Sequence, residues 1–281
     1  MNNSPSQGTL YVVATPIGNL EDITPRAARI LKEVDLIACE DTRHTRKLLS
    51  HLQISTALTS YYREKEQLKT PQLLKKLRAG LSIALVSDAG TPGVSDPGAV
   101  LVREARLNNI TVEPIPGPSA LTAAVSVAGL EENGFFFGGF PPAKQGERIR
   151  FFTGLARLPY PLVFYESPRR LKNCLKDCLD VFGNRSALLF KELTKLHEQS
   201  FAGRLSDIAE PLEDAQRGEF VLIIMPGKGS RDKPDNLPEL LAWYKDKDMS
   251  LKDAVQAISG DLNLPRNQVY QEALKVWKPK R

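Results

Sequence analysis

The stretch Ala84-Leu85-Val86-Ser87-Asp88-Ala89-Gly90-Thr91-Pro92-Gly93 decides the fold class of this chain. A short apolar run ends in a turn rich in Gly and Pro, and a helical pattern follows over Pro97–Leu107. A buried strand, a tight turn and a helix in this order are typical of a parallel α/β sheet. Ligands of such sheets collect at the carboxyl ends of the strands, so Asp88 is expected beside a ligand.

Two further runs end in turns of similar composition. Tyr11–Ala14 leads into Thr15-Pro16-Ile17-Gly18-Asn19, and Val112-Glu113 leads into 114–120. We expect the three turns to form the floor and walls of one pocket, although each could also be no more than a tight connection between a strand and a helix. Proline has no N–H, and the signatures of dinucleotide and P-loop phosphate sites are absent. The turns therefore suit an uncharged adenosine beside a cationic sulfonium better than a phosphate.

The first part of the chain alternates strands with helices, which predicts right-handed crossovers and a mostly parallel sheet. The strands are expected at Thr9–Ala14, Asp35–Cys39, Leu81–Ser87 and Thr111–Pro114, and the helices at Pro25–Glu33, Thr42–Ser50, Glu64–Arg78 and Pro97–Leu107.

The second part predicts a mixed sheet. Strands are expected at Leu162–Glu166, Ala187–Glu192, Leu196–Ala202 and Phe220–Met225, with a helix at Pro168–Phe182. Because Leu196–Ala202 follows its predecessor directly, those two strands should pair antiparallel. The domain linker is placed near the start of 129–146, which is rich in Gly, Pro and Phe.

A small helical appendage should follow the polar linker Ser230–Asn236. Its helices are expected at Pro238–Lys245, Leu251–Ser259 and Arg266–Trp277, with Ser250 and Pro265 suited to helix starts. The predicted division is a disordered tail at 1–8, an N-terminal α/β domain at 9–128, a C-terminal α/β domain at 129–229 and the appendage at 237–281.

The bulk properties fit a cytoplasmic protein that neither spans nor anchors in a membrane. The chain carries a formal net charge of +5 and three cysteines, and it has no long apolar run. A pI near 9.0 permits an anionic partner without requiring one. His44, His51 and His197 lack the spacing of metal ligands, so no metal is expected.

Several motifs are similar to those of the small-subunit ribosomal RNA methyltransferase I family of the tetrapyrrole methylase superfamily. They are Thr15–Leu20, Cys39–Arg43, Ser87–Pro92, Pro116–Ala120, Gly139–Lys144, Phe164–Pro168 and Lys191–Lys195. The resemblance runs in order from about Leu10 to Met225. One departure is Tyr61–Glu66, where the family commonly carries a stretch rich in histidine and asparagine.

The resemblance implies a two-domain homodimer that binds S-adenosylmethionine in the cleft between its domains. The acceptor would be the ribose 2′-oxygen of a cytidine in the decoding region of 16S ribosomal RNA in the small subunit. The expected donor contacts are Pro16, from the first turn, together with Asp88, Ala89, Gly90, Thr91, Pro92, Ser119, Ala120, Tyr165 and Val221.

The residues themselves leave the acceptor chemistry open. Asp41 or Glu192 could accept the proton of a ribose hydroxyl, although Asp41 could equally cap a helix and alignment alone could drive transfer. Candidates for phosphate contact are Arg43, Arg46, Lys144, Arg169 and Lys195. Arg148, Arg150, Arg170 and Lys172 add positive charge that could meet phosphate or form a solvated helix face, and the appendage ends with Lys275, Lys278, Lys280 and Arg281.

Two other functions fit the same residues. A relative in the superfamily could methylate a tetrapyrrole or a protein residue, using the same donor turns and a different acceptor cleft. A ribosome-assembly factor without catalysis would have a decayed donor pocket, which the intact Asp88–Pro92 turn argues against.

Overall fold

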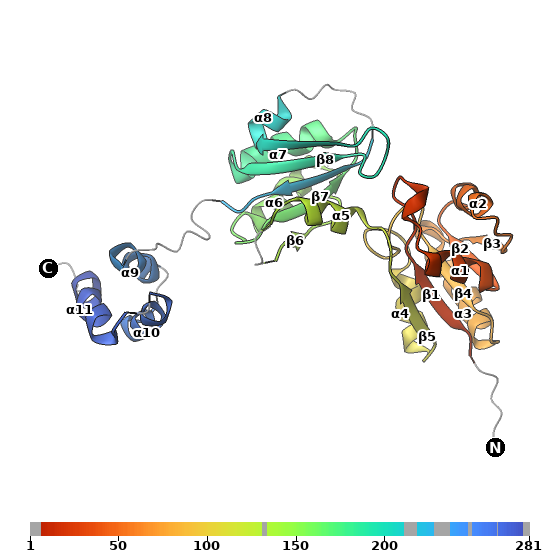
Figure 1. The fold of residues 1–281 in the computed structure, drawn as a ribbon, viewed down its shortest axis with the longest axis horizontal. Coiled ribbons are helices and arrows are strands. Elements are labelled where there is room, and N and C mark those ends of the chain that lie inside the picture. Colours follow the sequence, from red (N-terminus) through yellow and green to blue (C-terminus); the bar gives the residue numbers. More distant parts are fainter. Residues whose placement is uncertain are drawn as a thin grey trace, which may run out of the picture. The chain divides into compact units, whose positions relative to one another are not determined.

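A computed structural model describes residues 7–130, 134–210, 218–227, 237–246, 249–262 and 264–277 (Figure 1). The chain divides into two compact units, one within Met1–Ala156 and Tyr160–Met225 and a smaller one comprising Arg157–Pro159 and Pro226–Arg281. Residues 1–6 of the expected tail and the expected linker Ser230–Asn236 lie outside the described residues. The N–H of Gly8 donates to the carbonyl of Leu77 at 2.8 Å, one residue before the first strand.

The first sheet of the larger unit has five strands, all parallel, in the order β3-β2-β4-β1-β5, which confirms the predicted architecture. The strands are β1 (Thr9–Val13), β2 (Leu36–Cys39), β3 (Leu58–Ser60), β4 (Ile83–Val86) and β5 (Thr111–Ile115). All four residues of β4 are buried, and β4 is the central strand. The turn at Ser87–Gly93 therefore starts from the middle of the sheet edge.

Helices cover both faces of this sheet. On one face, α1 (Pro25–Glu33) and α2 (Thr42–His51) bury Leu31 and Leu49 against the strands. On the other, α3 (Glu66–Arg78) and α4 (Ala99–Leu107) bury Leu77 and Leu101. The start of α1 is fixed locally, since the side chain of its N-cap residue Thr24 accepts the N–H of Ala27 at 3.1 Å.

The second sheet is mixed, as expected, with the order β6-β7-β10-β8-β9. Its strands are β6 (Phe136–Phe137), β7 (Leu162–Glu166), β8 (Ser186–Lys191), β9 (Gln199–Arg204) and β10 (Phe220–Ile224). Only β6 and β7 pair parallel among these, and β8 and β9 form the predicted antiparallel pair.

Three helices pack against the second sheet. On one face, α6 (Gln145–Leu155) and α7 (Leu171–Phe182) pack through the rings of Phe152, Phe164 and Phe182. On the other face, Ala124 of α5 (Ala120–Val127) packs with Val221 and other apolar residues of β7, β8 and β10. The short helix α8 (Leu205–Ala209) follows β9.

The smaller unit contains α9 (Leu237–Asp246), α10 (Leu251–Asp261) and α11 (Arg266–Trp277), close to the predicted bounds. Ser250 caps α10 as expected, and its side chain accepts the N–H of Asp253 at 3.2 Å. The three helices share a core of their own, which includes Leu241, Ile258 and Val269.

Candidate active site

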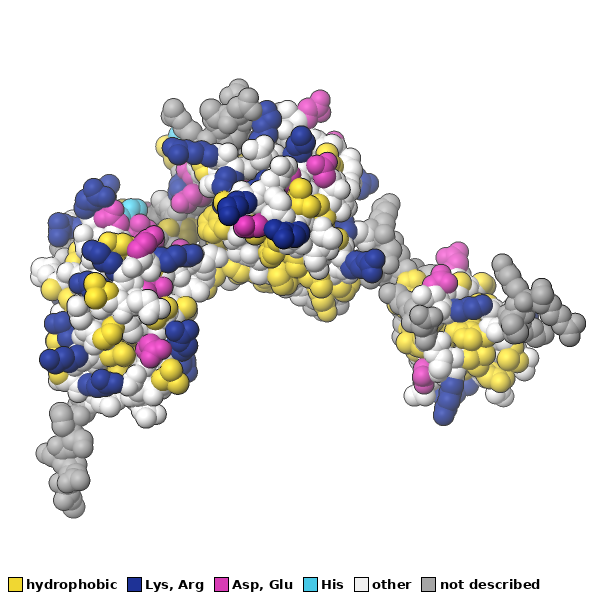
Figure 2. Space-filling view, turned by 180° about the vertical axis from the view of Figure 1, so that it is seen from behind, with side chains coloured by type: hydrophobic (Ala, Val, Ile, Leu, Met, Phe, Trp, Pro, Cys, Tyr) yellow, Lys and Arg dark blue, Asp and Glu magenta, His cyan; other side chains and the backbone are white. Residues whose placement is uncertain are grey.

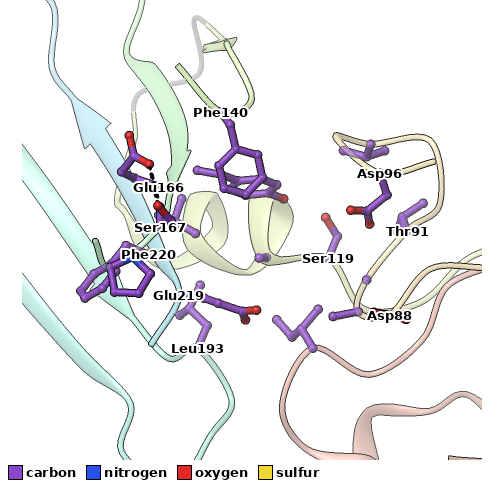
Figure 3. Close-up of a pocket in the computed structure, with 18 of the residues that line it drawn as sticks. Asp88, Thr91, Asp96, Ser119, Phe140, Glu166, Ser167, Leu193, Glu219 and Phe220 are labelled. Carbon is purple, nitrogen blue, oxygen red and sulfur yellow. Dashed lines mark hydrogen bonds between the residues drawn. The ribbon is translucent and has the colours of Figure 1, made fainter. Parts of the chain in front are cut away.

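The three Gly/Pro turns of the first sheet lie together and line one cavity of about 440 Å³ (Figure 3). The other wall comes from the ends of β7 and β10. The lining residues are Ile17, Glu40, Asp88, Ala89, Gly90, Thr91, Val94, Asp96, Ser119, Ala120, Phe140, Tyr165, Glu166, Ser167, Pro168, Leu193, Glu219, Phe220 and Val221. The volume is in the range of small-molecule sites.

Backbone and hydroxyl contacts hold the three turns against one another. Thr15 and Gly90 exchange two N–H···O hydrogen bonds, each of 2.9 Å. The hydroxyl of Thr91 donates to the carbonyl of Pro118 at 3.2 Å. Gly90 has φ of +82°, a conformation that glycine adopts without strain. The floor of the cavity is therefore fixed by the sheet edge.

The first turn also meets the segment after β8. A Cβ on Gly18 would lie 2.3 Å from Cγ of Lys195 and 3.0 Å from the carbonyl oxygen of Leu193, so only glycine fits there without a shift. In the same segment Glu192 and Thr194 have φ of +55° and +66°, which is uncommon for residues other than glycine. This close approach joins the first sheet to the second at the cavity.

Tyr165 connects the wall of the second sheet to the third turn. Its hydroxyl accepts the N–H of Leu121 at 2.9 Å, near the start of α5. Its ring packs edge-on against Phe137 and Phe140. Burial chiefly raises the pKa of Tyr165, so the phenol is protonated at neutral pH and can donate a hydrogen bond of its own.

Glu166 is buried beside the cavity, and its carboxylate holds the part of the cavity wall that includes Phe140. The carboxylate accepts the N–H of Ser167 at 2.7 Å and pairs with Arg170 at 3.2 Å. Arg170 also donates to the carbonyl of Pro141, next to Phe140. With its oxygens engaged in this way, Glu166 positions the loop that carries Phe140.

Five carboxylates line the cavity: Glu40, Asp88, Asp96, Glu219 and Glu166, the last of which is paired with Arg170. Burial chiefly raises the pKa of both Glu40 and Asp96, and the charge of Asp88 raises both further. Lys195 lies 3.1 Å from Glu219 and balances its charge. The cavity thus combines an apolar floor with an excess of negative charge, an environment that favours a cationic ligand with an apolar part.

The two expected proton acceptors lie outside the cavity lining. Asp41 caps α2, and its carboxylate accepts the N–H and guanidinium hydrogen bonds of Arg43, which lower its pKa to about 2. Glu192 accepts the N–H of Glu219 at 2.9 Å and the ammonium of Lys195 at 2.8 Å. Burial would raise the pKa of Glu192, but these hydrogen bonds outweigh it and the pKa is lowered.

Of the expected donor contacts, most line the cavity and two do not. The lining includes Asp88, Ala89, Gly90, Thr91, Ser119, Ala120, Tyr165 and Val221. Pro92 is not in it, and Pro16 lines a separate cavity of about 40 Å³.

The sequence reasoning did not select Asp96, Glu219 and Phe140. Asp96 sits in the same connection as Asp88, eight positions further, and its place after a strand end was an available signal. Glu219 and Phe140 reach the cavity only through the arrangement of the second sheet, which no local pattern indicates.

The basic residues expected to contact phosphate fall into two groups. Arg43, Arg46, Lys144 and Arg169 are exposed, while Lys195 is partly buried in its ion pairs. Arg148 differs from the expectation of phosphate contact or a solvated face. It is buried, and its Nε donates to Asp177 at 2.7 Å.

Within the described ranges no group of His, Cys, Asp and Glu is arranged to hold a metal ion, and all three cysteines are buried and free. No helix among the described residues is long and apolar enough to span a membrane.

Comparisons with known proteins agree with this architecture. Residues 9–209 match the family described as Tetrapyrrole (Corrin/Porphyrin) Methylases. A protein of Synechocystis sp. named Ribosomal RNA small subunit methyltransferase I is 45% identical over 96% of this chain and 98% of its own. A protein of the same name from Xylella fastidiosa is 48% identical over 77% of this chain and 81% of its own.

Solved structures show the same fold at lower identity. Uroporphyrin-III C-methyl transferase from Thermus thermophilus, complexed with S-adenyl homocysteine, is 22% identical with a TM-score of 0.57, covering 77% of this chain and 97% of that one. Diphthine synthase is 13% identical with a TM-score of 0.62, covering 78% of this chain and 90% of that one. With this fold and these relatives, the chain belongs to the small-subunit ribosomal RNA methyltransferase I group of the tetrapyrrole methylase family.

Proposed function

We propose that this protein transfers a methyl group from S-adenosylmethionine to the ribose 2′-hydroxyl of a cytidine in the decoding region of 16S ribosomal RNA. The observation that carries the proposal is the cavity, in which apolar residues face the carboxylates of Glu40, Asp88 and Asp96 beyond the carboxyl edge of the parallel sheet, together with Glu219 from the start of β10. The names of the relatives supply the acceptor class, small-subunit ribosomal RNA.

The residues of the cavity fit the methyl donor. Ile17, Ala89, Leu193 and Val221 offer apolar surface to an adenine. Asp88 and Ser119 supply oxygen acceptors for ribose hydroxyl or amino groups. The carboxylates of Asp96 and Glu219 point into the same space, where they favour a positive charge (Figure 3). When bound, the donor supplies an activated methyl group.

The protein's own residues then have to align the acceptor and exclude water. Phe140 and Tyr165 form an aromatic edge on the side of the cavity that Glu166 and Arg170 support. An aromatic edge of this kind can stack against a base, which is how unstacked nucleotides of RNA are commonly held. Alignment of two reactants is by itself a large part of catalysis.

We propose that four exposed basic residues contact the phosphate backbone: Arg43, Arg46, Lys144 and Arg169. Lys195 donates a hydrogen bond to Glu219, which lines the cavity, so any contact of Lys195 with RNA would lie next to Glu219. Phosphate contacts make RNA binding weaken as salt rises, so methylation should fall between about 50 and 200 mM salt. We also propose that the protein acts as a homodimer in the cytoplasm.

The function is tested by methylating purified small subunits with isotope-labelled S-adenosylmethionine, digesting the RNA and identifying the labelled nucleoside by mass spectrometry. We expect labelled 2′-O-methylcytidine. A matched control subunit with 2′-deoxycytidine at the labelled position should accept no label, because the acceptor oxygen is missing. Label on a base carbon or nitrogen, or efficient methylation of a uroporphyrin, would contradict the proposal.

A further inference from the structure

Methylation of a ribose hydroxyl leaves one proton to be removed. Asp41 and Glu192 are poorly placed for it, because neither lines the cavity and both have lowered pKa values within ion pairs. Glu166 lines the cavity, but its carboxylate is taken up by Ser167 and Arg170. The remaining carboxylates of the lining are Glu40, Asp88, Asp96 and Glu219.

Two of these four carboxylates are already engaged. Asp88 accepts the N–H of Asp41 at 2.9 Å, and Glu219 pairs with Lys195 at 3.1 Å. Glu40 lies directly after β2, and the negative charges of Asp88 and Asp96 both raise its pKa. The carboxylate of Asp96 projects from a loop into the cavity (Figure 3), and the Ser87 hydroxyl lowers its pKa.

The loop that carries Asp96 is held in an uncommon conformation. Ser95 has φ of +68°, which is uncommon for residues other than glycine. On either side of it, Gly93 and Gly98 have φ of +80° and +131°, which glycine adopts without strain. The guanidinium of Arg63 donates to the carbonyl of Ser95 at 3.3 Å, and the N–H of Gly98 donates to Glu66 at 2.8 Å. Backbone strain held by several contacts is often found at functional sites, where it fixes the direction of one side chain.

The charges around Asp96 suit a proton acceptor. Burial chiefly raises its pKa, the Ser87 hydroxyl lowers it, Asp88 and Glu219 raise it, and Arg63 lowers it. The neighbouring Glu40 has a raised pKa for the same main reason. A carboxylate whose pKa is raised above its usual range is a stronger base in its ionised form.

We propose that Asp96 is the catalytic base, which accepts the proton of the acceptor ribose hydroxyl. This inference rests on the proposed function. In the step, the hydroxyl oxygen forms a bond to the donor methyl carbon while the carbon–sulfur bond breaks and its electron pair stays on sulfur. The hydroxyl proton passes to the carboxylate of Asp96. The products are a methyl ether, a neutral thioether and protonated Asp96, which returns the proton to water.

The test is single-turnover methylation of small subunits at saturating donor over a range of pH. The wild-type rate should rise with pH until Asp96 is ionised and then level off. Asp96→Asn should lower the rate about 100-fold or more and abolish this rise. Asp96→Glu should restore part of the rate together with the pH dependence. Affinity for S-adenosylhomocysteine, which lacks the sulfonium charge of the donor, should fall much less than the rate does, which separates a loss of the proton acceptor from a loss of donor binding.

Two further variants make the result decisive. Ser87→Ala removes a hydrogen bond that favours the ionised form, so the acidic limb of the profile should move to higher pH. Glu40→Gln tests the other lining carboxylate whose pKa is raised, and it should leave the rise of the rate with pH in place even if methylation slows.

An Asp96→Asn rate within about threefold of wild type, with the pH profile unchanged, overturns the role of Asp96 and leaves the proposed function standing. Loss of the profile in Glu40→Gln alone transfers the role to Glu40. If Asp96→Asn does not fold, an unmoved profile in Ser87→Ala overturns the proposal. If the wild-type protein forms no 2′-O-methyl product, the proposed function is wrong. The role of Asp96, which rests on that function, is then wrong as well.

Discussion

The backbone N–H of Asp41 donates a 2.9 Å hydrogen bond to the carboxylate of Asp88, and so joins the ends of the adjacent strands β2 and β4. Asp88 lines the cavity, whereas the side chain of Asp41 turns away to cap α2. The carboxylate that should bind the methyl donor is therefore also a structural acceptor. Substitutions of Asp88 have to be chosen to separate these two roles.

Asp88→Ala removes both the charge and the acceptor for Asp41, and we expect it to weaken S-adenosylmethionine binding by about 1–3 kcal/mol. Asp88→Asn keeps an oxygen for the Asp41 N–H, so it should lose donor affinity with a smaller loss of thermal stability. Calorimetric titration and thermal unfolding measure the two effects. Asp180→Asn, at an exposed position of α7, is the control for charge alone. Unchanged donor affinity in a folded Asp88→Ala protein would remove Asp88 from the site.

Tyr61 gives a prediction about stability at high pH. Its buried hydroxyl lies 2.9 Å from that of Thr70, and burial chiefly raises the pKa of Tyr61 from its usual 10.0 to about 12. The folded state favours the neutral phenol, so its contribution is fully present below about pH 10 and is lost as the pH rises through about 12. The shift corresponds to about 2–3 kcal/mol.

Tyr61→Phe should therefore flatten the fall of the free energy of unfolding between pH 10 and pH 12. At pH 7 the variant should be less stable by about 1 kcal/mol, because Thr70 loses a buried partner. Urea unfolding at several pH values measures both, and the difference between the two proteins cancels the titration of other groups. Parallel pH curves for the two proteins would mean that Tyr61 ionises in the folded state as it does in the unfolded chain.

The first sheet could be predicted because its information is local. The strands β1 and β4 are short apolar runs, and β1, β4 and β5 lead into turns of Gly and Pro. The helix α1 has the period of one buried face, with Ala27, Ile30 and Leu31. Three similar turns at one edge then indicated the cavity. Asp88, Gly90 and Ser119, which line the cavity, lie in these turns.

The remaining elements lack such signals. The strand β3 has only three residues, β6 has two, and α5 is apolar on most positions and buries only Ala124 within the larger unit. The helix α6 begins at Gln145, inside the stretch whose Gly and Pro content indicated a linker. Asp41 and Glu192 were chosen for chemistry at strand ends, but whether a carboxylate is free or paired depends on tertiary neighbours such as Arg43 and Lys195.

An exposed apolar surface on the larger unit gives a prediction about assembly. Val127 of α5 is 66% exposed and Phe135, next to β6, is 39% exposed. Figure 2 shows hydrophobic side chains gathered along the lower side of the lobe that contains the second sheet. Contiguous apolar surface is a common feature of protein interfaces. We expect Val127→Glu to shift the protein from dimer to monomer in light scattering, because a charge would be desolvated there. Leu107→Glu, at a 70% exposed position of α4, should leave the dimer unchanged. A monomeric wild type, or a dimer in both variants, would exclude this surface.

The helical unit of α9, α10 and α11 has its own buried core, so a chain that ends at Gly227 should keep a folded larger unit. Every lining residue of the cavity lies before position 227, and donor affinity should therefore persist in the shortened chain.

We expect the shortened chain to methylate small subunits more slowly and to bind them more weakly, because the helical unit carries basic residues suited to a phosphate backbone. Lys275 lies in α11, where it pairs with Glu272 at 2.6 Å, and Lys278, Lys280 and Arg281 lie outside the described residues. Circular dichroism, light scattering and calorimetry with S-adenosylmethionine verify that fold, oligomeric state and donor site survive.

The matched full-length control replaces Lys278, Lys280 and Arg281 with Glu. If that control alone reproduces the loss of subunit binding and lowers its salt dependence, the unit acts through phosphate contacts. If both proteins methylate at the wild-type rate, the helical unit has no part in substrate engagement, and if the shortened chain loses donor binding, the unit is structural.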